Sequence, residues 1–211
     1  MKWEEVLRFL KNQPVIETLM LGNKPEELAR MRVQLSRWVK SGRLVKVRNG
    51  LYIFADAYRP EFPDREYIAT FAIRPSYISL EYALSGYGLI PEYVPAVTLV
   101  TTKRPGKIMF SGNRFVYRHV QPRLFWGYIP KGGKNFEIFY AEPEKAVLDL
   151  FYFTKGELTL DYMEEMRFQN TEILNMDKMI GYAAKFGQPR ISKAAELFSH
   201  FAGRERGMKE L

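Results

Sequence analysis

The sequence has no cysteine and only two histidines, His119 and His200. A disulfide framework and thiolate chemistry are therefore excluded, and so is a zinc site built from histidine and cysteine. Apolar runs fall far short of the roughly 20 residues that a membrane-spanning helix needs. Residues 2–11 mix acidic, basic and apolar side chains, unlike the continuous apolar core of a signal peptide. These absences favour a cytoplasmic protein without a membrane partner.

Motifs for catalysis and for cofactor binding are also missing. The segment KGGK at 131–134 lacks the spacing of a phosphate-binding loop, and GYG at 86–88 does not match a dinucleotide fingerprint. The carboxylates Glu142 and Glu144 stand where acids stabilise the start of a helix, and we expect Asp149 to pair with Lys145 four residues earlier. No nucleophile with a neighbouring base is visible. We therefore expect neither an enzyme nor a cofactor.

Acidic side chains are missing from two long stretches, although the chain contains 24 of them. Residues 28–55 hold seven lysines and arginines and no acid, and residues 93–136 hold eight and no acid. The formal net charge of the whole chain is +8, with a pI near 9.5. A charge balance of this kind permits a polyanionic partner.

The first acid-free stretch follows two predicted helices. Residues 3–11 are amphipathic, and Thr18 is a candidate cap for a short helix that Gly22 stops. A long helix is predicted to begin at Pro25, which suits the first helical position, and to stop at Gly42. One stripe of this long helix is apolar and comprises Leu28, Met31, Leu35, Trp38 and Val39.

A hairpin is predicted directly after the long helix. Residues 44–54 alternate in polarity, with Val45 and Val47 on one face, and the Asn49-Gly50 pair is a strong hairpin signal. Helix, short helix, long helix and hairpin follow one another as in a winged helix-turn-helix, which we predict for residues 1–58. Its partner is then double-stranded operator DNA, with the long helix in the major groove and the wing on the backbone. The candidate DNA-binding residues are Arg30, Gln34, Arg37, Lys40, Ser41, Arg43, Lys46, Arg48 and Asn49. A merely solvated basic face is the alternative.

Residues 59–211 are predicted to form a larger α+β domain. A proline-rich polar segment at 55–66 is typical of a linker. Helices are expected at 66–73, at 80–88 with Ser79 as a cap, and at 142–153, with strands near 96–102, 107–112, 114–120, 125–130 and 136–141. Further helices are expected at 161–168, 176–186 and 191–201. The prediction is a mostly antiparallel sheet with C-terminal helices.

The second acid-free stretch runs through these strands and interleaves basic with aromatic residues. Such strands can bind nucleic acid, but most of the aromatic rings are expected in the core, which leaves a solvated basic sheet as the alternative. The candidate second basic surface comprises Lys103, Arg104, Lys107, Arg114, Arg118, Arg123, Lys131 and Lys134.

Four segments resemble the AbiEi-type antitoxins of the type IV toxin–antitoxin (abortive infection) systems. They are GRLVKVRNGLY at 42–52, SLEYALSGYGLI at 79–90, VTLVTT at 97–102 and, above all, FYAEPEKAVLDLFYF at 139–153. The resemblance runs in order from about residue 13 to about residue 155 and is only generic in the last fifty residues.

This resemblance implies a winged-helix repressor of its own operon, joined to a larger domain that is needed for antitoxin action. It also implies a functionally paired nucleotidyltransferase-like toxin that forms no stable direct complex with the antitoxin. One alternative is a stand-alone winged-helix regulator whose C-terminal domain binds a ligand or a protein. Another alternative is an enzyme that its winged helix directs to its target, but the missing catalytic motifs argue against this.

Overall fold

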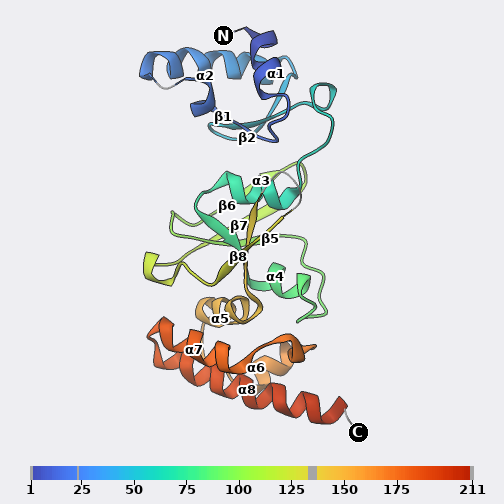
Figure 1. The fold of residues 1–211 in the computed structure, drawn as a ribbon, viewed down its shortest axis with the longest axis vertical. Coiled ribbons are helices and arrows are strands. Elements are labelled where there is room, and N and C mark those ends of the chain that lie inside the picture. Colours follow the sequence, from blue (N-terminus) through green and yellow to red (C-terminus); the bar gives the residue numbers. More distant parts are fainter. Residues whose placement is uncertain (1, 23, 133–136, 210–211) are drawn as a thin grey trace. The chain divides into compact units, whose positions relative to one another are not determined.

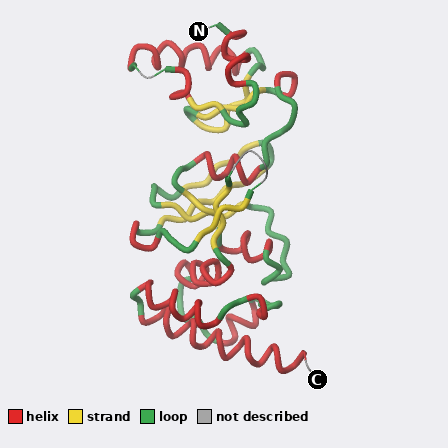
Figure 2. The backbone as a smooth tube through the Cα atoms, viewed as in Figure 1, coloured by secondary structure: helices red, strands yellow, loops and turns green. Residues whose placement is uncertain are grey.

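The chain forms two compact units, Met1–Ala72 and Ile73–Leu211. The computed structural model describes residues 2–22, 24–132 and 137–209. Each unit has helices and strands of its own, which Figure 2 distinguishes by colour. The α+β class predicted from the sequence is confirmed.

The boundary between the units lies later than the one expected after residue 58. The short 3-10 helix η2 (Asp56–Tyr58) and helix α3 (Arg65–Ala72) both belong to the first unit. The ring of Tyr58 packs against Trp3, with ring centroids 5.0 Å apart. The guanidinium of Arg48 donates a hydrogen bond to the main-chain carbonyl of Ala72. These contacts join residues 56–72 to the N-terminal core.

The helices of the N-terminal core begin and end close to where the sequence predicts. Helix α1 spans Trp3–Leu10, and helix α2 spans Pro25–Lys40 with proline at its start. Between them, the 3-10 helix η1 spans Thr18–Leu21. The expectation that Thr18 caps this helix is wrong, because its main-chain N–H and its hydroxyl both donate to the carbonyl of Gly50. Thr18 therefore ties η1 to the tip of the hairpin.

A small antiparallel sheet closes the N-terminal core. Strands β1 (Ile16–Glu17), β2 (Leu44–Arg48) and β3 (Leu51–Phe54) lie in the order β1-β3-β2. An irregularity in the β2–β3 pairing between Lys46 and Arg48 breaks the alternation along β2. Val47 is consequently buried and Val45 exposed, so the expectation that both share one face is wrong. The buried core of these elements comprises Trp3, Val6, Ile16, Leu21, Met31, Leu35, Trp38, Leu44, Tyr52 and Phe54.

The second unit is built on a six-stranded mixed sheet in the order β6-β7-β5-β4-β9-β8. The strands are β4 (Ser76–Ile78), β5 (Val97–Thr101), β6 (Gly106–Phe110), β7 (Asn113–His119), β8 (Tyr128–Lys131) and β9 (Ile138–Ala141). The pairs β4–β9 and β5–β7 are parallel, whereas β4–β5, β6–β7 and β8–β9 are antiparallel. The sheet is thus antiparallel in most of its pairs, and the sequence did not predict β4.

Helix α5 (Pro143–Phe153) lies between this sheet and the C-terminal helices, as Figure 1 shows. It contacts β9 and α4 (Leu80–Gly86) as well as α7 (Met176–Phe186) and α8 (Pro189–Lys209). Helix α6 (Leu160–Glu165) packs on α8. Residues 144–151 of α5 are all buried, as expected for a helix enclosed on every side.

Candidate nucleic-acid interface

Helix α2 turns a basic face to solvent. Arg30, Arg37 and Lys40 are exposed, and the apolar residues of the opposite side, such as Met31 and Leu35, are buried in the core. The 3.6-residue period of a helix places residues 30, 37 and 40 about the side opposite this core. Gln34, expected on the same face, is half-buried, because its position around the helix lies between Arg37 and the buried stripe.

The charge of α2 changes sign along the helix. Glu26 and Glu27 are exposed in the first turn, where negative charge stabilises the helix N-terminus. From Arg30 to Lys40 the helix carries only basic charged side chains. A phosphate backbone would be repelled at the first turn and attracted along the rest of the helix.

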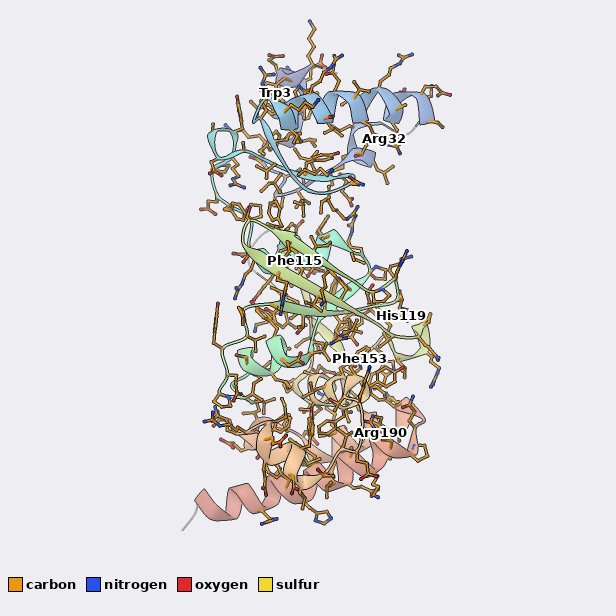
Figure 3. The ribbon with its side chains drawn as sticks, turned by 180° about the vertical axis from the view of Figure 1, so that it is seen from behind. Trp3, Arg32, Phe115, His119, Phe153 and Arg190 are labelled. Atoms are coloured by element: carbon orange, nitrogen blue, oxygen red, sulfur yellow. The ribbon has the colours of Figure 1, made fainter. Side chains whose placement is uncertain are left out.

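Arg32 is exposed as well, and the sequence reasoning left it out of the candidate set. It lies on the flank of α2, between the apolar stripe and the opposite face, and is labelled in Figure 3. Arg32 lies within the acid-free stretch of residues 28–55, and that signal could have placed it in the candidate set.

Two cations of the β2–β3 hairpin differ in their contacts. Lys46 is exposed and has no carboxylate partner among the described residues, whereas Arg48 makes hydrogen bonds within the protein. Arg48 is half-buried and donates both to the carbonyl of Ala72 and, over 2.6 Å, to the carbonyl of Asn49. Asn49 itself is exposed at the turn, where Gly50 has a φ of 82°.

Two further candidates have structural contacts. The guanidinium of Arg43 lies 5.2 Å from the ring centroid of Trp3 and is half-buried. The hydroxyl of Ser41, just past the end of α2, donates to the carbonyl of Trp38 over 3.2 Å. Among the seven cations of residues 28–55, those with no described protein partner are therefore Arg30, Arg32, Arg37, Lys40 and Lys46.

The candidate residues of the second basic surface do not all lie together in the structure. Lys107, Arg114 and Arg118 lie on one exposed face of the β6–β7 pair, and Lys103 and Arg104 are exposed in the preceding loop. Arg123 instead donates to Gln121 and to the carbonyl of Phe186, and Lys131 lies on β8 at the opposite edge of the sheet. Lys134 falls outside the described residues.

The aromatic residues of the second basic stretch do not form a stacking platform on β6 and β7. Phe110, Phe115 and Tyr117 are buried, as the sequence reasoning expected for most of them. Phe115 and His119, labelled in Figure 3, belong to the same strand, and only the histidine is exposed. Stacking of unpaired bases on these rings is therefore not available at this face.

The carboxylates of α5 are engaged with neighbouring side chains. Asp149 pairs with Lys145, as expected, and accepts hydrogen bonds from Tyr77 over 3.0 Å and from Ser79 over 2.8 Å. The ammonium of Lys145 also donates to the Tyr77 hydroxyl over 2.8 Å. Burial lowers the pKa of Lys145, although Asp149 opposes this, and burial beside Asp149 raises the pKa of Tyr77 well above its ordinary value.

A second polar cluster joins the start of α5 to α7. Lys178 donates to Glu142 over 2.7 Å and lies 3.1 Å from an oxygen of Glu144, while Tyr182 donates to Glu142 over 2.5 Å. Burial alone would raise the pKa of Glu142, but the bonds from Lys178 and Tyr182 outweigh it and lower that pKa. Each carboxylate therefore has a structural partner, and none is paired with a nucleophile.

No protein-family model matches the chain, and no curated protein matches it in sequence. Across the described residues there is no cluster of three or more possible metal ligands among histidine, cysteine, aspartate and glutamate. Over the same residues, none of the helices has the length and apolar character to cross a bilayer.

Proposed function

We propose that this protein is a DNA-binding transcriptional repressor whose N-terminal unit is a winged helix-turn-helix. The observation that carries the proposal is the exposed cationic face of α2, continued by Lys46 on the adjacent hairpin, in a segment that contains no acid from residue 28 to residue 55. Five cations there have no partner among the described residues. Phosphate groups would supply the missing counter-charge.

The order of elements supports the winged-helix interpretation. Helix α1, strand β1, short helix η1, helix α2 and the β2–β3 hairpin follow one another, and β1 pairs with β3 to close the sheet. The core side of α2 packs on this frame through Met31, Leu35 and Trp38, which leaves its basic side outward. A helix presented in this way fits the width of the major groove of B-DNA.

The residues divide into two roles in this proposal. Arg37 is exposed in the middle of the basic face and is long enough to reach guanine edges, and Gln34 beside it suits adenine. Arg30, Lys40 and Lys46 neutralise phosphates, which fixes the position of the protein without reading sequence. Arg43 and Arg48 chiefly hold the hairpin against Trp3 and Ala72.

We further propose that the repressor acts as the antitoxin of a type IV toxin–antitoxin system and represses its own operon. The support is the resemblance of residues 42–52, 79–90, 97–102 and 139–153 to AbiEi-type antitoxins. In the last of these segments, Lys145 and Asp149 make the buried contact that holds α5 to β4, so the motif has a role in the fold of the second unit. A stand-alone regulator remains the alternative, and a nucleotidyltransferase-like gene beside this one would decide for the antitoxin.

The test is the binding of the full chain to a duplex of its own promoter, followed by fluorescence anisotropy across a range of salt concentrations. We expect the affinity to fall with a log–log slope of about −0.9 for each phosphate neutralised. The variant Arg30→Gln, Arg37→Gln, Lys40→Gln should lose most of the binding and fail to repress a promoter–reporter fusion.

The matched control removes the same charge from the second unit. Lys155→Gln, Lys193→Gln, Arg204→Gln changes three exposed cations that lie outside both basic stretches. It should bind like the wild type apart from a small loss of long-range attraction. Equal losses in the two variants, or wild-type binding that ignores salt, would overturn the proposal.

A further inference from the structure

Three cations of the second unit form a cluster that we call the β7 face. Arg114 and Arg118 lie four residues apart on β7, so the two-residue period of a strand directs both to the same side of the sheet. Lys107 on β6 pairs with Val116, which lies midway between them. All three side chains are exposed.

The register brings these charges close together. Because Lys107 is directly opposite Val116, Arg114 and Arg118 are its two diagonal neighbours, with Cα atoms about 7–8 Å away. The same side of β6 carries Met109, which is opposite Arg114 and is 65% exposed. Like charges at such spacing repel one another unless an anion lies between them.

No carboxylate of the described residues forms an ion pair with this cluster. The β7 face makes none of the ion pairs found in the second unit, and the segment from residue 93 to residue 136 contains no acid at all. Three other cations of the unit do have protein partners. Arg190 donates to three main-chain carbonyls, Arg123 donates to that of Phe186, and Lys178 binds two carboxylates.

We propose that the β7 face is a second contact for duplex DNA, which binds the sugar–phosphate backbone without reading sequence. This inference rests on the proposed DNA binding and adds the second unit to it. Clustered cations without acids match a polyphosphate chain better than a protein surface of mixed charge. Single strands are disfavoured, because Phe115 and Tyr117, which would stack on bases, are buried on the other side of the sheet.

The experiment measures the salt dependence of DNA binding by the full chain carrying Lys107→Gln, Arg114→Gln, Arg118→Gln. If all three side chains neutralise phosphates, the magnitude of the log–log slope falls by about 2.7, since each contact contributes about 0.9. Between 50 and 200 mM salt, the affinity of the variant would then fall about 40-fold less than that of the wild type. Promoter and scrambled duplexes should lose affinity by the same factor.

The control variant Lys155→Gln, Lys193→Gln, Arg204→Gln should keep the wild-type slope. A β7-face variant with that same slope overturns the inference, and it leaves the proposed function intact as long as the α2 variant still loses binding. A loss confined to the promoter duplex also overturns it, because the face would then read bases. An unchanged slope with lost protection against a co-encoded toxin would assign the face to a protein partner instead. Wild-type protein that does not bind DNA overturns both proposals.

Discussion

Lys145 donates a hydrogen bond to Asp149 one helical turn later, and neither side chain is exposed to solvent. The ammonium also lies about equally far from three aromatic rings, 5.1 Å from those of Trp126 and Phe186 and 5.2 Å from that of Tyr77. An ion pair enclosed in this way loses its hydration and depends on the remaining hydrogen bonds for compensation. Tyr77 and Ser79 supply them from β4 and its end, which fixes α5 against the sheet.

Removing one member of this pair should destabilise the second unit strongly. Lys145→Met leaves the Asp149 carboxylate buried beside two hydroxyls but without its cation, so we expect a loss of about 3–5 kcal/mol in the free energy of unfolding. The loss is measured as a lower urea midpoint at an unchanged slope. Combining Lys145→Met with Asp149→Asn removes both charges and should recover a substantial part of it. A double variant as unstable as the sum of the single variants would contradict the coupling.

The contact of Glu142 with Lys178 and Tyr182 should make stability depend on pH. The pKa of Glu142 is lowered in the folded state, so its contribution is present above the ordinary value of 4.5 and is lost as the pH falls through the folded pKa. Glu142→Gln should therefore cost about 1–2 kcal/mol at neutral pH, with a difference from the wild type that shrinks in acid. Urea unfolding at successive pH values follows this difference. A constant difference at every pH would show that the carboxylate charge plays no part.

Replacing Lys46 or Arg48 of the β2–β3 hairpin with alanine should affect different properties, DNA binding for Lys46 and stability for Arg48. Lys46→Ala should reduce the magnitude of the salt slope of DNA binding by about 0.9, as for one lost phosphate contact, and leave stability unchanged. Arg48→Ala removes the bond to the carbonyl of Ala72 and should lower the free energy of unfolding by about 1 kcal/mol. Anisotropy and urea titrations on both variants separate the two effects. If Arg48→Ala alters the slope and not the stability, the roles of the two residues are reversed.

Gly127 should tolerate no side chain. Its φ is +73°, and a Cβ built there would lie 3.0 Å from Cγ of Lys145. Gly127→Ala should therefore destabilise the second unit by about 1–3 kcal/mol. Gly181, inside α7, has open space around it, so Gly181→Ala should raise stability by about 0.5–1 kcal/mol. Thermal or urea unfolding of the two variants tests the contrast, which equal effects would contradict.

Segments with strong local signals were predictable from the sequence. Helix α7 has the bounds expected for it, and α2 begins at Pro25 as the preference of proline for the first helical position indicates. The exposure of Arg30, Arg37 and Lys40 on α2 also followed from helical periodicity, because these residues lie opposite an apolar stripe that packs inward. These features depend on residues only a few positions apart.

Features that depend on distant partners were not predictable. Strand β4 is only three residues long, and Tyr77 and Ile78 give too short an apolar run to indicate the middle of a sheet. Ser79 was expected to cap α4, but its hydroxyl donates to Asp149, seventy residues away. Likewise, no local pattern distinguishes Arg48, which contacts Ala72, from Lys46, which remains exposed.

The place of β4 in its sheet also bears on the order in which the chain can fold. On one side β4 pairs with β5 around residue 99, and on the other with β9 at Tyr140. During synthesis from the N-terminus, β4 therefore keeps an open edge until residues 138–141 have emerged. The strand pairs of the first unit, by contrast, all lie between Ile16 and Phe54. The N-terminal sheet can thus be complete before β9 is available to pair with β4. We therefore expect the second unit to form more slowly than the first and to be more exposed to mispairing.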